Sequence, residues 1–109
     1  MGDELELLTI VLCTHFVADF MLQTSWMALN KSSKWQALFA HIGLYSLCLL
    51  PFGWLFAAVN GGAHLITDAV TSRITKYLWS RQRTHEFFVV IGFDQLLHVL
   101  VLIWTAYLI

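Results

Sequence analysis

Four long apolar stretches occupy most of this 109-residue sequence, and they leave few folds open to it. They cover residues 5–23, 34–50, 52–76 and 87–109, and each comes close to the about 17–25 residues that a membrane-spanning helix needs. Hydrophobic residues make up 59% of the chain and charged residues 12%, and a soluble domain of this size has too little interior to bury so many apolar side chains. The sequence therefore predicts an all-α fold, with residues 1–109 forming a single membrane domain as a bundle of four transmembrane helices.

The basic residues predict how this bundle lies in the membrane. All six occur in two of the predicted connections or at the ends of the stretches that border them, at Lys31, Lys34, Arg73, Lys76, Arg81 and Arg83. Because basic loops stay on the cytoplasmic side, both termini and the turn at Pro51 are expected on the non-cytoplasmic side. The prediction is a multi-pass protein whose two basic connections face the inside of the cell.

Composition argues against several other classes of protein. The net charge of -1, without a basic face interleaved with aromatic residues, gives no reason to expect nucleic-acid binding. A soluble four-helix bundle would need a polar outer face, and none of the four stretches carries a continuous charged stripe. Cys13 and Cys48 stand alone without CxxC spacing, so neither a disulfide framework nor a thiolate metal site is predicted.

Three pairs of histidine and aspartate lie inside the apolar stretches. They are His15–Asp19, His64–Asp68 and Asp94–His98, and the third pair has the reverse order. Residues at this spacing share one helical face. The first and third stretches are predicted to run inward and the fourth outward, so the reversal brings the three acids to one depth and the three imidazoles to the next. His41, on the second stretch, falls at a comparable depth.

Such a layer of ionisable groups needs an explanation, because its members are costly inside a membrane and usually mark a functional site. One explanation is structural, with three hydrogen-bonded pairs that hold the helices together. Polar bonds between membrane helices contribute only about 0.6 kcal/mol each, whereas an Asp at the centre of a helix costs about 2.5–3.5 kcal/mol to insert. A bound divalent metal ion explains the layer better, since it would cancel the buried negative charge.

Imidazoles and carboxylates suit zinc, the first choice here, and also manganese or iron. The predicted metal ligands are His15, His64, His98, Asp19, Asp68 and Asp94. The predicted catalytic residues are the same three aspartates, as bases or as partners of the ligating imidazoles, with His41 as a fourth ligand or proton donor. Gln23 and Gln95 are predicted to orient substrate or water. The sequence leaves open whether one ion or two is bound.

The motifs that carry these residues also resemble a known family. They are the run from His15 to Ala28, then Asn30-Lys31, Trp35, His41, the His64–Asp68 pair and Asp94-Gln95-Leu96-Leu97-His98. Together they resemble domain-of-unknown-function family 3307, a group of small bacterial and phage integral membrane proteins, over nearly the whole chain. The resemblance implies a place in the bacterial cytoplasmic (inner) membrane, and it supplies no activity.

The function predicted from the residues themselves is hydrolysis by a metal site inside the membrane. A metal ion with an open position lowers the pKa of bound water toward about 7 and so supplies a nucleophile. The basic residues on the same side favour an anionic amphiphile as substrate, for example a phospholipid or a prenyl phosphate. The predicted partners are this substrate and the lipid bilayer, and a homo-oligomer stays open.

Three alternatives to hydrolysis stay open at this stage. Transport of protons, metal ions or small solutes could use the polar run of Asn60, His64, Asp68 and Ser72. Haem could be held by two of the imidazoles, although the three carboxylates beside them argue against it. A non-catalytic membrane module could keep the His–Asp network only to fix the register of its helices.

Overall fold

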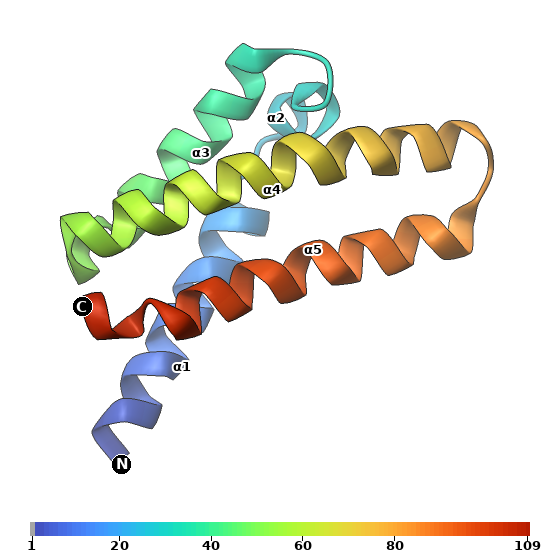
Figure 1. The fold of residues 1–109 in the computed structure, drawn as a ribbon. Helices are drawn as coiled ribbons and strands as arrows, with labels where there is room; N and C mark the ends of the chain where they lie inside the picture. The colour runs from blue at the N-terminus through green and yellow to red at the C-terminus, as the bar shows by residue number, and fades with distance from the viewer. Residues whose placement is uncertain (1) are drawn as a thin grey trace.

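The computed structural model describes residues 2–109, and within them the chain forms five α-helices and three short helical turns (Figure 1). The α-helices are α1 (Gly2–Phe16), α2 (Ser25–Asn30), α3 (Trp35–Leu49), α4 (Trp54–Ser80) and α5 (Thr84–Trp104). The turns are η1 (Val17–Met21), η2 (Leu50–Phe52) and η3 (Ala106–Leu108). The described residues contain no β-strand, and the predicted all-α fold is confirmed.

The two longest helices, α4 and α5, form an antiparallel hairpin against which the other helices pack (Figure 1). Helix α3 lies along α4, and α1 crosses the bundle at an angle and contacts both α3 and α5. The short helix α2 lies in the connection between the first and second apolar stretches and packs against α3. Its start is capped by Thr24, whose hydroxyl oxygen accepts a hydrogen bond from the Met27 backbone N–H at 3.2 Å.

The hairpin between α3 and α4 depends on one turn and one close contact. Pro51 begins the turn within η2, and Gly53 follows with a φ of 132°, a conformation that only glycine adopts readily. Further along α4, Gly61 faces Ser46 of α3 so closely that a Cβ on Gly61 would overlap the serine side chain. The glycine therefore allows the two helices to approach, which brings the histidines of α3 and α4 together.

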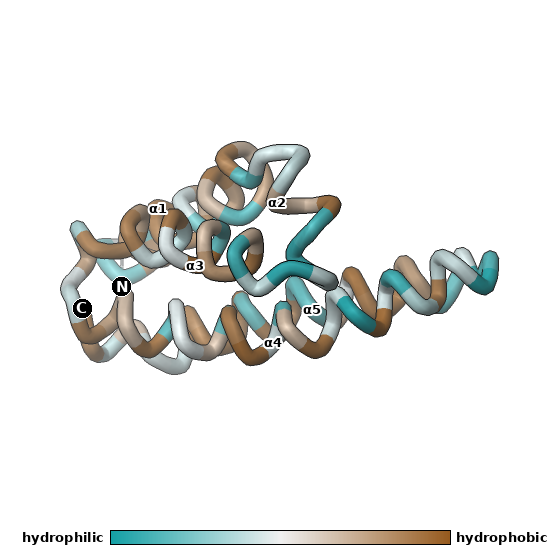
Figure 2. The backbone as a smooth tube through the Cα atoms, turned by 90° about the horizontal axis from the view of Figure 1, so that it is seen from above, coloured by the Kyte–Doolittle hydropathy of each residue, from teal (hydrophilic) through white to brown (hydrophobic). Residues whose placement is uncertain are grey.

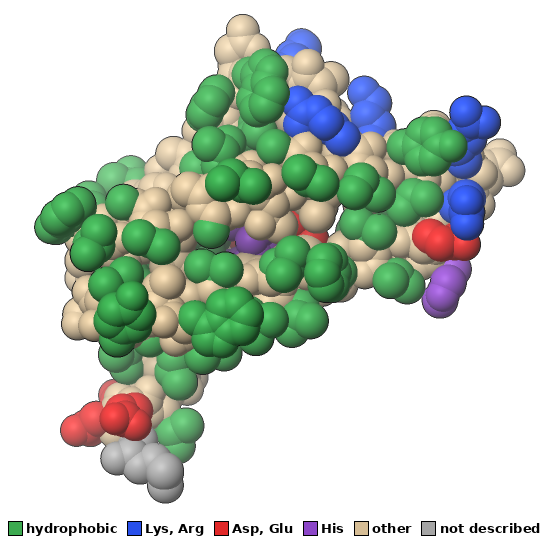
Figure 3. All heavy atoms as spheres, in the orientation of Figure 1, with side chains coloured by type: hydrophobic (Ala, Val, Ile, Leu, Met, Phe, Trp, Pro, Cys, Tyr) green, Lys and Arg blue, Asp and Glu red, His purple; other side chains and the backbone are tan. Residues whose placement is uncertain are grey.

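Large apolar side chains cover much of the outer surface. Trp54 is 72% exposed, Ile66 69% and Phe88 60%, and Figure 3 shows hydrophobic side chains spread along the visible face of the bundle. Figure 2 shows hydrophilic positions at the turn between α4 and α5 and in the connection that follows α2. Lys and Arg side chains gather at this end of the molecule in Figure 3, whereas acidic side chains near the start of α1 lie at the opposite end.

Two helical segments of the described chain, Trp35–Phe52 and Thr84–Trp104, are long and apolar enough to cross a membrane. Helix α1 has only 15 residues. Helix α4 has 27 residues, but the apolar part of it contains Asn60, His64 and Asp68, which lower its mean hydropathy. The polar residues that α4 contributes to the site are thus the same ones that make it less apolar than an ordinary membrane-spanning helix.

Candidate metal centre

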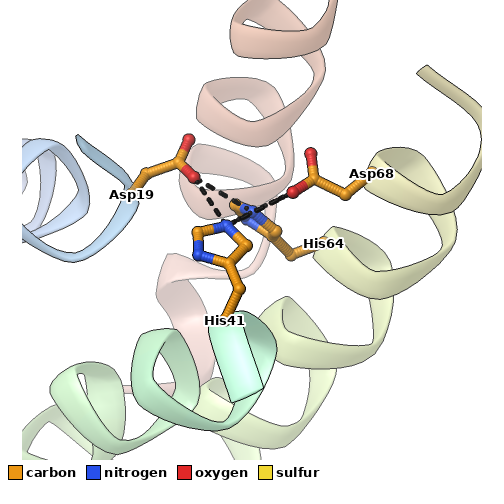
Figure 4. Close-up of side chains that lie close together, drawn as sticks. All are labelled: Asp19, His41, His64 and Asp68. Atoms are coloured by element: carbon orange, nitrogen blue, oxygen red, sulfur yellow. Dashed lines mark hydrogen bonds and ion pairs between the residues drawn. The ribbon is translucent and has the colours of Figure 1, made fainter. Parts of the chain in front are cut away.

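Four buried side chains bring one ligand atom each to a common point between the helices (Figure 4). Asp19 comes from η1, His41 from α3, and His64 and Asp68 from α4. The Nε2 atom of His41 lies 3.0 Å from Asp19 Oδ1 and 3.3 Å from Asp68 Oδ2. The Nε2 atom of His64 lies 3.2 Å from each of the same two oxygens. The two Nε2 atoms are 3.1 Å apart.

Five of the six separations in this group are close to those of a tetrahedral metal site, and the sixth, between the two carboxylate oxygens, is within 4.8 Å. Zinc binds imidazole nitrogens and carboxylate oxygens at about 2.0–2.2 Å, and four atoms at the shorter of these distances in a tetrahedron lie about 3.3 Å from one another. Without a cation, protonated imidazoles could donate to the two carboxylates, but their Nε2 atoms would then face each other at 3.1 Å, and an unprotonated Nε2 atom would point its lone pair at carboxylate oxygens. A cation at the centre satisfies all four groups at once.

The position of Asp19 depends on a π-helical turn that follows α1. The Leu22 N–H donates to the Val17 carbonyl at 2.9 Å, the five-residue hydrogen bond of a π-helix. This wider turn lets the Asp19 carboxylate reach His41 and His64. The His15 Nε2 to Asp19 Oδ2 distance is 3.9 Å, longer than the 3.2 Å within the His64–Asp68 pair and the 3.1 Å within the Asp94–His98 pair.

A second group of possible metal ligands adjoins the first, and it consists of Asp19, Asp94 and His98. His98 Nε2 lies 3.1 Å from Asp94 Oδ2 and 3.4 Å from Asp68 Oδ1. The His98 ring stacks on the His64 ring, with centroids 3.8 Å apart and an interplanar angle of 4°. The hydroxyl of Thr71 donates to Asp94 Oδ1 at 2.5 Å and holds this carboxylate from α4.

Gln95 and His15 support the carboxylates from outside both groups. The Gln95 amide nitrogen donates to Asp19 Oδ2 at 3.0 Å and to Asp94 Oδ2 at 3.1 Å. The Gln95 carbonyl oxygen lies 3.0 Å from His15 Nε2, and His15 Nδ1 lies 2.8 Å from the Tyr45 hydroxyl. Both ring nitrogens of His15 therefore have protein partners, which places this predicted ligand one contact away from the groups that could hold a metal.

The structure thus brings most of the predicted site residues together, with some in different places than expected. His41, which was a candidate fourth ligand or proton donor, lies inside the tightest group. Gln95 contacts two of the carboxylates, and Gln23 lines the neighbouring cavity with its side-chain oxygen buried and without a hydrogen-bond partner in the described residues.

Three residues at the site were not among the predicted site residues. Lys31 donates to Asp68 Oδ2 at 3.1 Å, although the sequence analysis named it only as a basic residue of a connection and as part of a family motif. Tyr45 packs its ring on His64, with centroids 4.1 Å apart. Spacing could have found Tyr45, which is one helical turn from His41, and Thr71, which is nearly one turn from Asp68.

The site opens into a cavity of about 190 Å³. The charged and polar residues that line it are Asp19, Gln23, Lys31, Asp68, Thr71, Ser72, Thr75, Asp94 and Gln95. A groove of about 430 Å³ adjoins it, shares Lys31, Ser72 and Thr75, and is lined further out by Leu29, Lys76, Trp79, Phe87 and Phe88. In Figure 3 histidine and acidic atoms are visible in the seam between α4 and α5.

The charges at the site favour a divalent cation. The centre contains three carboxylates, those of Asp19, Asp68 and Asp94, and Lys31 contacts one of them, Asp68, at 3.1 Å. If the imidazoles are neutral, as ligation requires, the group has an excess of two negative charges. One divalent ion would balance it.

The family model described as "Protein of unknown function (DUF3307)" matches residues 7–109, and the chain belongs to this family. The resemblance stated from the motifs is therefore confirmed. No curated protein and no solved structure matches the chain. The family description gives no activity, so the function has to be argued from the site.

Proposed function

We propose that this family member is a membrane-embedded, metal-dependent hydrolase that acts on a phosphate-bearing amphiphile. The observation that carries the proposal is the group of four buried ligand atoms, spaced for a tetrahedral metal ion, beside a cavity that contains a lysine. Buried ionisable groups beside a cavity are typical of active sites, and a bound metal ion would explain why these groups lie together. Zinc is the first choice for two imidazoles and two carboxylates, and manganese and iron are the alternatives.

The two connected cavities fit an amphiphile with an anionic head. Lys31 lies where the polar cavity meets the groove, with Lys76 further along the groove. These two amines would attract a phosphate group, and the groove beyond them is lined by the large apolar side chains of Leu29, Trp79 and Phe88. A substrate would therefore place its phosphate at the metal centre and its hydrocarbon chain against the apolar side chains of the groove.

The reaction would be hydrolysis of a phosphate ester. A bound divalent ion activates water and stabilises the charge that develops on the phosphoryl oxygens. The water oxygen forms a bond to phosphorus, and the ester P–O bond breaks. The electron pair of that bond leaves on the alcohol oxygen, which takes up the proton that the attacking water has given to a carboxylate of the centre. Lys31, Gln23 and Gln95 line the cavity and would hold the phosphate and the water in place.

Within this proposal all four apolar stretches span the bacterial cytoplasmic membrane, with both termini outside. The gathering of Lys and Arg side chains at one end of the molecule supports this orientation, and so does the wide exposure of apolar side chains between the two ends. The metal site would then open toward the cytoplasmic side, where Lys31 and Lys76 lie. A homodimer through the exposed apolar faces remains compatible with this arrangement.

A non-catalytic module with a structural metal ion is the second candidate. It is favoured by the number of protein ligands, because structural zinc sites are closed by four of them whereas catalytic sites keep a position for water. Transport is supported less well, since buried apolar residues fill the bundle beyond the site, among them Leu49, Phe56 and Leu102.

The proposal is tested by phosphate release from phosphatidic acid and from a prenyl phosphate in mixed detergent micelles. We expect release by the wild type with added zinc or manganese, and loss of release in His41→Ala. The matched control is His85→Ala, which removes an exposed histidine outside the site. Transport needs a sealed compartment, so product release in micelles separates the two activities. Protein that binds metal but releases no phosphate from either compound would favour the structural module.

A further inference from the structure

We propose that the centre holds two metal ions, and that the second ion, bound by Asp94, His98 and Asp19, is the one that activates water. This inference rests on the proposed hydrolase function, and it assigns the two ions to two different groups of ligands. Asp19, His41, His64 and Asp68 form the first site, and Asp19, Asp94 and His98 form the second.

The carboxylate of Asp19 is placed to bridge the two sites. Its Oδ1 atom lies 3.0 Å from His41 Nε2 and 3.2 Å from His64 Nε2, within the first site. Its Oδ2 atom faces the other way, because the Gln95 amide nitrogen contacts this oxygen at 3.0 Å and Asp94 Oδ2 at 3.1 Å. One carboxylate thus offers an oxygen to each site, as bridging ligands do in two-metal centres.

Asp68 has the same two-sided arrangement. Its Oδ2 atom lies 3.3 Å from His41 Nε2 and 3.2 Å from His64 Nε2, whereas its Oδ1 atom lies 3.4 Å from His98 Nε2. The second site therefore has His98 and Asp94 of its own and shares Asp19 with the first site, while the outer oxygen of Asp68 lies beside it. Two ions joined in this way would lie close together, at about the 3.5–4 Å that is usual for two-metal hydrolytic centres.

An unpartnered nitrogen points independently to a ligand at the second site. His98 is 4% exposed, and its Nε2 atom has no hydrogen-bond partner of suitable geometry among the described residues. A buried polar atom without a partner is costly, and each such atom needs a physical reason. Since this nitrogen lies 3.1 Å from Asp94 Oδ2, within the group that also contains Asp19, a cation bound by these three residues supplies that reason.

The second site has fewer protein ligands than the first. Four protein ligands close the first site, whereas the second has three, and two of these, Asp19 and Asp94, line the 190 Å³ cavity together with Gln95 and Asp68. A catalytic ion needs a position for water or substrate, and the smaller number of protein ligands leaves one at the second site. Gln95 would act as a positioning residue, because each carboxylate oxygen has a second lone pair that can accept the amide hydrogen while the oxygen binds metal.

Two ions also narrow the substrate class. With Lys31 and neutral imidazoles, one divalent ion balances the three carboxylates, and a second ion leaves an excess of two positive charges. A phosphate monoester carries about two negative charges near neutral pH. The charge of the two-ion centre therefore fits a phosphate monoester at the end of a hydrocarbon chain better than a diester or a neutral ester.

The test is metal stoichiometry, measured with Mn²⁺ alone on purified, folded protein in detergent. We expect two Mn²⁺ per chain in the wild type and in the control His85→Ala, with a paramagnetic resonance spectrum of two coupled ions. His98→Ala and Asp94→Asn should each keep one ion and lose the coupling, and Asp19→Ala should bind neither ion tightly. If one of the two single-site variants fails to fold, the other gives the same readout.

The outcomes separate this inference from the proposed function. A wild type that binds one ion per chain, or variants at His98 and Asp94 that leave the stoichiometry unchanged, would overturn the two-ion centre, even if phosphate is released. Two coupled ions without hydrolysis of any phosphate monoester would support the centre and contradict the hydrolase function. Release of phosphate that disappears together with the second ion in His98→Ala would support both.

Discussion

The buried side chains between the ends of α3 and α5 and the start of α4 are mostly apolar, with Leu49, Phe56 and Leu102 fully covered. One or two helical turns nearer the basic end, the buried side chains of the same helices include histidines and aspartates of the site and Thr71. The apolar region can tolerate some change in shape, because its contacts are numerous and weak. In the polar region each atom depends on specific partners, and removal of one leaves the others uncompensated. A single substitution in the polar region is therefore expected to abolish function, whereas substitutions in the apolar region are expected to lower stability by degrees.

The largest effect is expected from Asp68→Asn in the polar region. Asp68 contacts His41, His64, His98 and Lys31, and the amide would replace a negative oxygen by a hydrogen-bond donor. We expect phosphate release to fall by about 1,000-fold or more, because no ion would remain to activate water. The measurement is the initial rate in mixed micelles, with the exposed Asp3→Asn as the matched control. Activity within a few-fold of the control would remove Asp68 from the centre.

The next effect concerns the apolar region. Phe56 is fully buried, and Phe56→Ala leaves a void, which in protein cores costs about 3–5 kcal/mol. We expect a large fall in the midpoint of unfolding, followed by circular dichroism in a mixed detergent, while the metal content of the folded fraction stays the same. Phe88→Ala, at a position that is 60% exposed, is the control. Loss of metal from folded Phe56→Ala protein would mean that the two regions are not separable.

A smaller effect is expected at the mouth of the polar region. Lys31→Met should raise the KM for phosphatidic acid by about tenfold, because the substitution removes one charge-assisted hydrogen bond to the phosphate. Metal content should not fall, because the substitution removes a positive charge 3.1 Å from Asp68. Lys34→Met, which changes an exposed lysine of the same connection, serves as the comparison. An unaltered KM would mean that Lys31 only neutralises the charge of the Asp68 carboxylate.

The smallest effect is expected where the two regions meet. Tyr45 packs with the apolar cluster, and its hydroxyl contacts His15 Nδ1 at 2.8 Å. Tyr45→Phe should lower the free energy of unfolding by about 1 kcal/mol through loss of one hydrogen bond. Tyr107→Phe, at an 82% exposed position, should change nothing measurable. A complete loss of metal in Tyr45→Phe would move this tyrosine from a supporting role into the centre itself.

The sequence was sufficient for much of the arrangement because helical spacing is regular. The His64–Asp68 and Asp94–His98 pairs lie on continuous α-helices, and their reversed order brings them to one level, as the antiparallel hairpin of α4 and α5 requires. The first pair departs from this logic. A π-helical turn begins at Val17, between His15 and Asp19. No residue type predicts such a turn, so the sequence could not show that these two side chains have different surroundings.

Long-range contacts account for the remaining differences. The contact of Lys31 with Asp68 depends on the path of a connection that contains the extra helix α2, and the sequence pattern predicted no helix there. The structure and composition support membrane crossing most directly for Trp35–Phe52 and Thr84–Trp104. The ionisable residues of α4 lower its hydropathy, so counting apolar residues cannot identify the helix that contributes most to the site.

The central claim is that the buried His–Asp group binds metal, and metal content measures it most directly. Wild-type protein purified in detergent without chelators or an added metal-affinity tag would be compared with His41→Ala and His85→Ala by elemental analysis. The account predicts at least one equivalent of zinc, manganese or iron per chain in the wild type and in His85→Ala, and a large loss in His41→Ala. Folded wild-type protein that contains no divalent metal, and takes none up when zinc or manganese is supplied, would contradict it.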